Sequence, residues 1–249
     1  MDKWFSHFDA QIGSETYDQV QLLRPDYRKA MDVLNKKAAT LIPNLPRRAA
    51  ILDVACGTAM ATIAAFSGRD VKGYRFVGLD LDQQLLDLAK KKLAKLGAKM
   101  EPICGDMMQA EPGLKFDLIL CVFAYHHVPD ANKSELCRRL RRWSNPGAHL
   151  LVLEICLHDH QIVPYYEAVK SHLDRATRDA KLCQRFLDWT KQTASASDNS
   201  EWKVPQSRVL DDFTAAKWRL QKKPERVWSS SELPADSGCF YFQFTKNTP

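Results

Sequence analysis

The sequence predicts an α/β fold in which a doubly wound sheet of seven strands carries helices on both faces. Short apolar runs alternate with amphipathic stretches from Ala49 to about Cys156, as they do in βαβ units with a parallel sheet. The run at residues 116–123 is apolar on both faces, as a central parallel strand must be. The tail returns to β-type sequence on both sides of a turn at residues 234–238, which indicates an antiparallel hairpin at one edge.

The predicted elements follow one another in a regular order. Helices are expected at residues 59–66, from Asp82 to Gly97, and from about residue 131 to 143. Asp82 can cap the second of these helices, and Gly97 can end it. Residues 1–43 and 158–198 also have helical patterns. Five parallel strands are expected at residues 50–55, 76–80, 100–104, 116–123 and 149–156, and the hairpin strands at 226–230 and 239–244.

The composition is that of an ordinary soluble globular protein, with 45% hydrophobic and 27% charged residues. No stretch approaches the roughly 18–20 apolar residues that span a bilayer, and the first nine residues lack the apolar run of a secretory signal. The seven cysteines form an odd set without a C-x-x-C pair, which argues against zinc ribbons and disulfide scaffolds. The chain is therefore expected in the reducing cytoplasm, without membrane contact.

The densest basic run is Arg138-Arg139-Leu140-Arg141-Arg142, and the net charge of the chain is +6. The run is interpreted first as the solvated face of a helix, because Leu136, Cys137, Leu140 and Trp143 supply a buried stripe. Cations near the end of that helix also suit its dipole. Nucleic-acid binding through this run is the disfavoured alternative.

The segment Leu52-Asp53-Val54-Ala55-Cys56-Gly57-Thr58-Ala59 carries the strongest chemical signal. A strand that runs into a tight turn of tiny residues lets a ligand approach the backbone beside a helix N-terminus. Asp80 ends the second strand, 23 residues after Gly57, and its carboxylate can accept hydrogen bonds from both ribose hydroxyls of an adenosine ligand. The G-x-G-x-x-G and P-loop fingerprints are absent, which disfavours nicotinamide and nucleotide-triphosphate enzymes.

In these motifs the chain resembles the class I S-adenosylmethionine (SAM)-dependent methyltransferases, and within them the small-molecule branch (methyltransferase domain 25/11-like) whose first motif reads D-x-x-C-G-T-G. Motif order, strand spacing and terminal hairpin match over nearly the whole chain. The resemblance implies a Rossmann-like fold with SAM as cofactor. It also implies one domain over residues 1–249, with an N-terminal helical lid (1–45), a SAM-binding core (46–157), an inserted helical substrate cap (158–222) and a C-terminal hairpin (223–249).

The resemblance also implies roles for particular residues. The turn after Asp53, with Ala55 and Gly57, would receive the methionine end of SAM, and Asp80 would hold its ribose. The other implied cofactor contacts are Leu81, Asp106 and Met107 around the adenine, Val122 and Phe123 near the sulfur, and Tyr17 and Tyr27 in the N-terminal segment. One departure is Ala59, which stands where the family has a final glycine. Its methyl group could narrow the methionine site or favour the helix that begins there.

The candidates for catalysis are Tyr125, His126 and His127, which follow the fourth strand where substrate and sulfur should meet. A histidine there could act as a general base, since it titrates near neutrality. The alternative is that His127 braces the loop by hydrogen bonds. Residues 158–160 (His-Asp-His) could in principle bind a metal, but no metal site is predicted. Tyr165, Tyr166 and Trp189 could shape a substrate pocket or belong to the core.

The leading functional hypothesis is methyl transfer from SAM to N or O of a small molecule, with S-adenosylhomocysteine (SAH) as product. One alternative keeps the enzyme class but makes RNA or protein the substrate. The Asn/Asp-Pro-Pro-Tyr/Phe motif used to methylate nucleobase amino groups is absent, and so is a Pro-Cys nucleophile for attack on a pyrimidine ring. Both absences argue against a nucleic-acid substrate. A third hypothesis is a protein of this fold that binds SAM or SAH for another purpose. The sequence predicts no oligomeric state.

Overall fold

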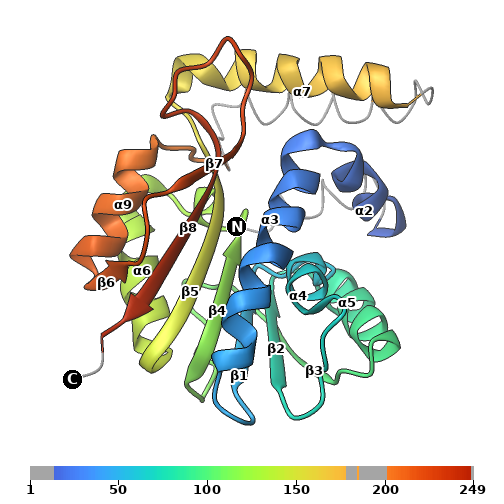
Figure 1. Ribbon diagram of the computed structural model, residues 1–249, viewed down its shortest axis with the longest axis vertical. Coiled ribbons are helices and arrows are strands. Elements are labelled where there is room, and N and C mark those ends of the chain that lie inside the picture. Colours follow the sequence, from blue (N-terminus) through green and yellow to red (C-terminus); the bar gives the residue numbers. More distant parts are fainter. Residues whose placement is uncertain (1–13, 178–183, 185–200, 248–249) are drawn as a thin grey trace.

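The computed structural model describes residues 14–177, 184 and 201–247, and in these residues one eight-stranded sheet lies between two layers of helices (Figure 1). The strand order is β3-β2-β1-β4-β5-β8-β6, with β7 also paired to β8. The first five strands pair in parallel, and β8 is antiparallel to β5. The strands are β1 (Ala50–Val54), β2 (Arg75–Asp80), β3 (Met100–Cys104), β4 (Phe116–Val122), β5 (Ser144–Cys156), β6 (Trp218–Leu220), β7 (Glu225–Trp228) and β8 (Gly238–Lys246).

The predicted α/β class is confirmed, with one strand more than expected. Both β6 and β7 pair with the edge of β8 that β5 leaves open, one after the other along its length. Residues 221–224, which end in Pro224, separate them. Because proline cannot donate to a sheet ladder, the edge strand is split in two there. The short strand β6 was not predicted. Strand β5 also begins earlier than predicted, at Ser144, with an irregular register opposite Phe116 and Leu118.

Helices cover both faces of the sheet, as expected. Along β4, Leu118 and Leu120 pack into the core beneath α3, α4 and α5, whereas Ile119 and Cys121 pack into the core on the other face, beneath α6 and α9. The helices are α2 (Ser14–Leu23), α3 (Pro25–Leu41), α4 (Met60–Phe66), α5 (Gln83–Lys95), α6 (Lys133–Arg142), α7 (Ile162–Ala176) and α9 (Gln206–Ala215). No helix among these described residues is long and apolar enough to cross a bilayer.

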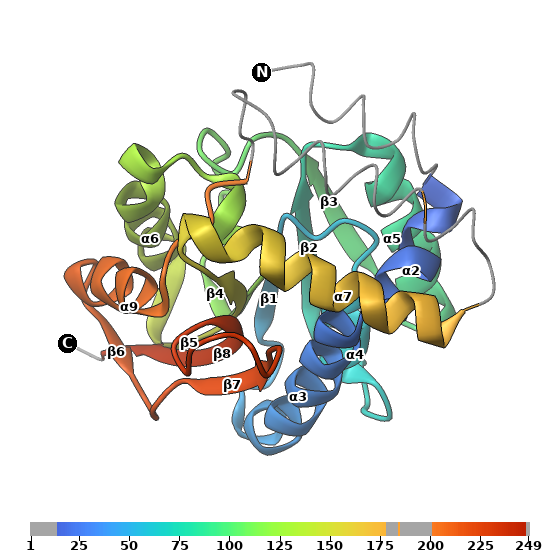
Figure 2. The same cartoon turned by 90° about the horizontal axis from the view of Figure 1, so that it is seen from above.

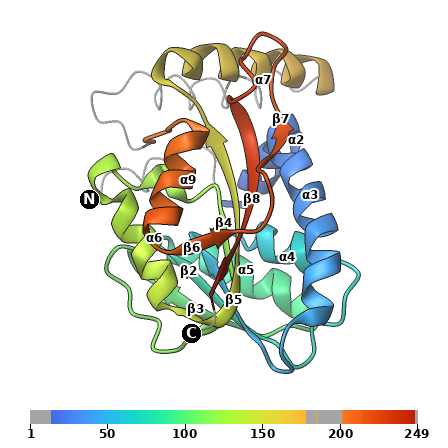
Figure 3. The same cartoon turned by 60° about the vertical axis from the view of Figure 1, so that its left-hand side comes forward.

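The two described helices between β5 and β6, α7 and α9, lie at different places on the sheet. Helix α7 crosses above the carboxyl ends of the parallel strands (Figures 1 and 2). A small apolar cluster that includes Tyr165, Val169 and Leu157 holds α7 there. Helix α9 lies instead beside α6 on the flank of the sheet (Figure 3). Of the two described helices in this region, α7 and not α9 lies near the carboxyl-terminal edge, where ligands of doubly wound sheets bind.

Candidate functional site

The turn after β1 has an unusual backbone. Ala55, Gly57 and Ala59 all have positive φ angles, of 51°, 51° and 62°. The amide of Cys56 donates to the carbonyl of Leu79, which fastens the turn to the neighbouring strand β2. Left-handed backbone costs an alanine more than a glycine. At Ala55 and Ala59 the turn therefore has a backbone conformation that is unfavourable for a residue with a β-carbon.

Ala59 lies in the core, immediately before helix α4. It is fully buried in the core between the sheet and helices α3–α5, and it is not among the residues that line the cavity described below. It also precedes α4 as the N-cap, in left-handed conformation. Its intrinsic helix preference therefore does not act there, because that preference applies to residues with helical dihedrals.

Asp80 lies at the carboxyl end of β2, against the turn. Its Oδ2 accepts a hydrogen bond from the amide of Gly57 (2.7 Å), and its Oδ1 accepts one from the amide of Asp82 (3.0 Å). Burial raises the pKa of this carboxyl above its ordinary value. Each carboxylate oxygen can accept more than one hydrogen bond, so both can still receive donors from a ligand.

Asp53, the last but one residue of β1, is also buried. Its Oδ2 accepts hydrogen bonds from the hydroxyl (2.7 Å) and the amide (3.2 Å) of Thr62 in α4. Burial raises the pKa of this carboxyl to about 7, while the bonds from Thr62 oppose the rise. Asp53 thus joins β1 to the helix that follows the turn.

A cavity opens at the carboxyl ends of β1, β2 and β4. Its lining includes the turn and Asp80 as well as residues from α2, α3 and α7. Seven of the predicted cofactor residues line it: Tyr27, Asp53, Ala55, Gly57, Asp80, Val122 and Phe123. Leu81, Asp106 and Met107 are not among its lining residues. Tyr17 lies in α2, but its side chain is outside the described part of the chain.

The N-terminal helices contact the site at two points. Tyr27 of α3 stacks on Phe123, with ring centroids 5.5 Å apart and planes 22° apart. Asp18 of α2 accepts a hydrogen bond from the hydroxyl of Thr58 in the turn, and it forms an ion pair with Lys92 of α5. Helix α2 is therefore fastened both to the turn and to the helix after β2.

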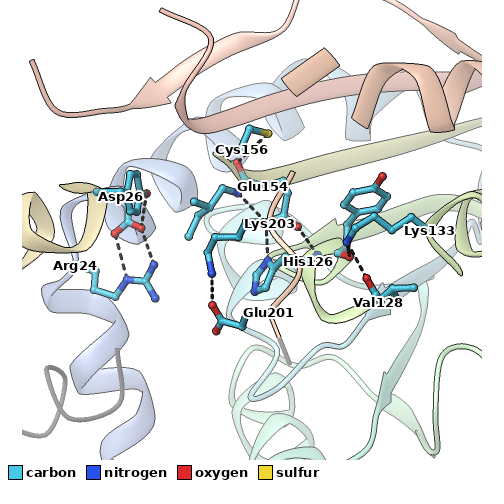
Figure 4. A network of polar contacts seen from close by, with 12 residues as sticks. Arg24, Asp26, His126, Val128, Lys133, Glu154, Cys156, Glu201 and Lys203 are labelled. Carbon is cyan, nitrogen blue, oxygen red and sulfur yellow. Dashed lines mark hydrogen bonds and ion pairs between the residues drawn. The ribbon is translucent and has the colours of Figure 1, made fainter. Parts of the chain in front are cut away.

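Of the three catalytic candidates, His126 has the most distinctive surroundings (Figure 4). It lines the cavity and its Nδ1 lies 2.6 Å from Oε1 of Glu154, while its amide donates to the other carboxylate oxygen (3.2 Å). Glu154 is only 1% exposed. Burial alone would raise the pKa of Glu154, but His126 and the hydrogen bonds from His126 and Ile155 hold it below its ordinary value. The carboxyl is therefore ionised.

His127 and Tyr125 are placed differently. His127 lines the cavity, and burial together with the neighbouring His126 lowers its pKa to about 3, which keeps it neutral. Tyr125 is fully buried in the core beneath α6 and α9, and its hydroxyl donates to Asp212 of α9 (2.5 Å). The ammonium of Lys133 lies 4.4 Å from its ring centroid. Tyr125 is not among the lining residues, so its side chain is a part of the fold on that face.

Two buried ion pairs beside the cavity were not predicted from the sequence. Arg24 pairs with Asp26 (2.6 Å), and Lys203 pairs with Glu201 (Figure 4). Arg24 and Glu201 line the cavity, so a positive and a negative group both face it. The partners in the second pair come from a segment that carries no motif. For Glu154 a signal did exist, because it is a lone carboxylate within an apolar strand, and such a group needs a partner.

The other predicted features lie as follows. Tyr166 lines the cavity and donates to Glu201 (3.3 Å), whereas Tyr165 donates to Asp26 (2.8 Å). Trp189 lies outside the described residues. The rings of His158 and His160 stack 5.8 Å apart, and the described residues contain no group of three or more potential metal ligands.

The basic run on α6 is largely engaged within the fold. Arg138 and Arg142 both bond to Glu135, at 2.8 and 3.0 Å. Arg139 is buried and donates to the carbonyl of Met107 in the loop after β3 (3.2 Å). The exposed Arg138 and Arg142 agree with the interpretation as a solvated helix face, whereas the buried Arg139 contradicts it, because its guanidinium binds the loop after β3.

Comparison with known proteins agrees with this architecture. Residues 51–147 match the family model of a methyltransferase domain. An uncharacterized methyltransferase of Schizosaccharomyces pombe is 28% identical over 42% of this chain and 38% of its own length. A carboxy-S-adenosyl-L-methionine synthase of Campylobacter lari is 23% identical over 83% of this chain and 90% of its own. The chain thus spans less than half of the first relative and most of the second.

A solved structure extends the likeness to the whole fold. The S-adenosylmethionine-dependent methyltransferase from Clostridium acetobutylicum superposes with a TM-score of 0.61 over 98% of both chains, at 13% identity. Domain match, relatives and fold agree with one another, and they agree with the D-x-x-C-G-T turn and the acidic end of the second strand. Residues 51–147 therefore match a methyltransferase domain, and the chain as a whole has the fold of a solved SAM-dependent methyltransferase.

Proposed function

We propose that this protein transfers the methyl group of SAM to nitrogen or oxygen of a small molecule and releases SAH. The proposal rests on one cavity that is lined both by the turn after β1 and by polar side chains from elsewhere in the chain. Ala55 and Gly57 of the turn line it together with Asp80, and so do the polar side chains of Arg24 and Glu201. Such a cavity suits a reaction between a bound nucleoside and a second, polar molecule.

The residues present fit SAM. Asp80 offers carboxylate oxygens to a ribose diol, and the tight turn at Gly57 allows close approach to the backbone. Val122 and Phe123 would lie beside the sulfonium, which supplies an electrophilic methyl group when SAM is bound. We further propose Leu81, Asp106 and Met107 for the adenine, although they lie beyond the cavity lining, and Tyr17 and Tyr27 as contacts from the N-terminal segment.

A small acceptor is supported by the other residues that line the cavity. Gln21 comes from α2, Tyr27 from α3 and Tyr166 from α7, and Arg24 lies between α2 and α3. Helix α7 lies over the carboxyl ends of the strands, whereas α3 covers one face of the sheet and contacts α7 (Figures 1 and 2). They would enclose the acceptor and choose it by shape, which is the role we propose for the N-terminal lid and for the part of the cap formed by α7.

Isotope transfer tests the proposal. The full chain is incubated with SAM labelled in its methyl group and with fractions of a small-molecule extract, and the label and SAH are followed by chromatography. We expect label in a small-molecule fraction together with SAH, and loss of both in Asp80→Asn. Label that appears only in added RNA or protein would support the alternative substrate classes and contradict this proposal.

One observation favours a second candidate. The relative whose match covers 90% of its own length is named a carboxy-S-adenosyl-L-methionine synthase, a protein that by its name makes a modified SAM. The chain could likewise bind SAM and alter it without methyl transfer. Mass spectrometry of the nucleoside released from the purified protein separates the two candidates, because a carboxylated SAM is heavier than SAM and SAH.

A further inference from the structure

Glu154 is a buried carboxylate whose two oxygens accept three hydrogen bonds. It stands on β5 and accepts from the amide of Ile155 (2.7 Å), from the amide of His126 (3.2 Å) and from the His126 ring (2.6 Å). An ionised carboxylate in such a place is costly unless it is well paired. These three contacts satisfy it, and they fix the loop after β4 to the strand beside it.

The same contacts assign the proton on the imidazole. An ionised carboxylate can only accept hydrogen bonds, so Nδ1 of His126, 2.6 Å from Oε1 of Glu154, must carry a hydrogen. In the neutral ring Nε2 then keeps its lone pair. His126 lines the cavity together with Val122 and Phe123, at the end of β4 where we propose the methyl group to lie.

We propose that Glu154 is a positioning residue that holds His126 with Nδ1 protonated, so that Nε2 serves as the general base for the methyl acceptor. The acceptor is then a hydroxyl group or a neutral amine, which has a lone pair for the attack and a hydrogen to lose. Its lone pair forms the bond to the methyl carbon, the electrons of the carbon–sulfur bond pass to sulfur, and its proton passes to Nε2. Glu154 stabilises the resulting imidazolium. This inference rests on the proposed function for the identity of the reaction, but the state of the ring does not.

The protein alone tests the positioning role. Two-bond ¹⁵N–¹H correlation spectra of the full chain, at mildly alkaline pH, report which ring nitrogen of His126 carries the proton, and His126→Asn assigns the signal. We expect the Nδ1–H tautomer in the wild type. In Glu154→Gln we expect a mixture, because an amide can donate as well as accept. An Nε2–H tautomer in the wild type, or no change in Glu154→Gln, would overturn the inference.

A matched variant separates positioning from mere stability. Asp212→Asn makes the same carboxylate-to-amide change at a residue bonded to Tyr125, outside the cavity lining. It should lower the melting temperature and leave the His126 tautomer unchanged. If it alters the tautomer as much as Glu154→Gln does, the pair only reports on packing of the loop, and the inference fails.

Turnover tests the acceptor class. SAH release is measured with a panel of phenols and primary amines, and with thioethers and tertiary amines that have no proton to lose. We expect release with the first group only, and a fall in kcat of about 10²-fold or more, with little change in KM, in His126→Asn. Release that is undiminished in His126→Asn would overturn the role of the base. If the wild type turns over no acceptor, the proposed function fails, while the tautomer still decides the role of Glu154.

Discussion

At the scale of single residues, the two alanines of the turn after β1 have left-handed backbone. Ala59 adopts φ 62° while fully buried, and Ala55 adopts φ 51° in the lining of the cavity. The sequence alone raised the question of space at Ala59. In the structure, Ala59 has left-handed backbone, and glycine at this position would relieve the resulting strain.

Glycine substitution measures that strain. In Ala59→Gly the relief of the left-handed backbone, about 1 kcal/mol, offsets the loss of a buried methyl, about 0.8 kcal/mol, so we expect little change in the free energy of unfolding. Ala65→Gly, equally buried but inside helix α4, should cost about 1.5–2 kcal/mol. Urea unfolding of both variants compares them. Equal costs would mean that Ala59 carries no strain.

The buried pair of Glu201 and Lys203 predicts a response to acid. Burial opposes ionisation of Glu201, but Lys203 and the nearby histidines lower its pKa to about 2, from an ordinary value of 4.5. Because the folded value lies below the unfolded one, the pair stabilises the fold above about pH 4.5, and this contribution is lost as the pH falls toward 2.

Melting temperature as a function of pH tests this prediction. Glu201→Gln should be less stable than the wild type near neutrality and should lack this part of the acid-induced loss. Glu101→Gln removes the carboxylate of a half-exposed surface pair with Arg75, and it should change the profile little. A wild-type profile identical in shape to that of Glu201→Gln would contradict the assignment.

At the scale of elements, the carboxylate of Asp18 attaches helix α2 to the site. Asp18 of α2 binds both Thr58 in the turn and Lys92 in α5. We expect Asp18→Asn to loosen α2 and to raise both the association and the dissociation rate of SAH, the latter by severalfold. Stopped-flow fluorescence measures both rates. The control is Asp32→Asn on the exposed side of α3, and equal rates in the two variants would argue against the attachment.

In the loop after β4, Tyr125 contacts helix α9, so its contribution to stability can be tested separately from ligand binding. Tyr125 donates to Asp212 of α9, on the face of the sheet away from α3–α5. Tyr125→Phe should therefore cost about 1–3 kcal/mol of stability, the range for a hydrogen bond to a charged group, without weakening SAH binding. Denaturant unfolding and calorimetric titration give the two quantities. A variant that keeps its stability but loses SAH would return Tyr125 to the list of site residues.

At the scale of the whole molecule, the sequence predicted what depends on local pattern. The five parallel strands are apolar runs, and their order along the chain determines where Asp53 and Asp80 meet. Strand β6 has only three residues, Trp218–Leu220, which is too short for an alternating pattern to appear. Its pairing with β8 depends on residues more than twenty positions away.

In the candidate site, too, residues next to strand ends were predicted, whereas contacts between residues distant in the sequence were not. The turn and Asp80 were predicted because they adjoin strand ends, and the structure brings them to one cavity. The contacts between Glu154 and His126, and between Asp18 and Thr58, join residues 28 and 40 positions apart. A single sequence contains no pattern that pairs such residues, so their partnership became visible only in the fold.

The central claim, that this fold binds SAM through Asp80, is tested most directly by calorimetric titration of the full chain with SAM and with SAH. Asp80→Asn is compared with Asp87→Asn, which changes an exposed carboxylate on α5. The wild type and Asp87→Asn should bind both ligands, and Asp80→Asn should bind at least about tenfold more weakly, the loss expected for hydrogen bonds to a charged group. A folded wild type that binds neither ligand, or an Asp80→Asn variant that binds as well as the wild type, would contradict the account.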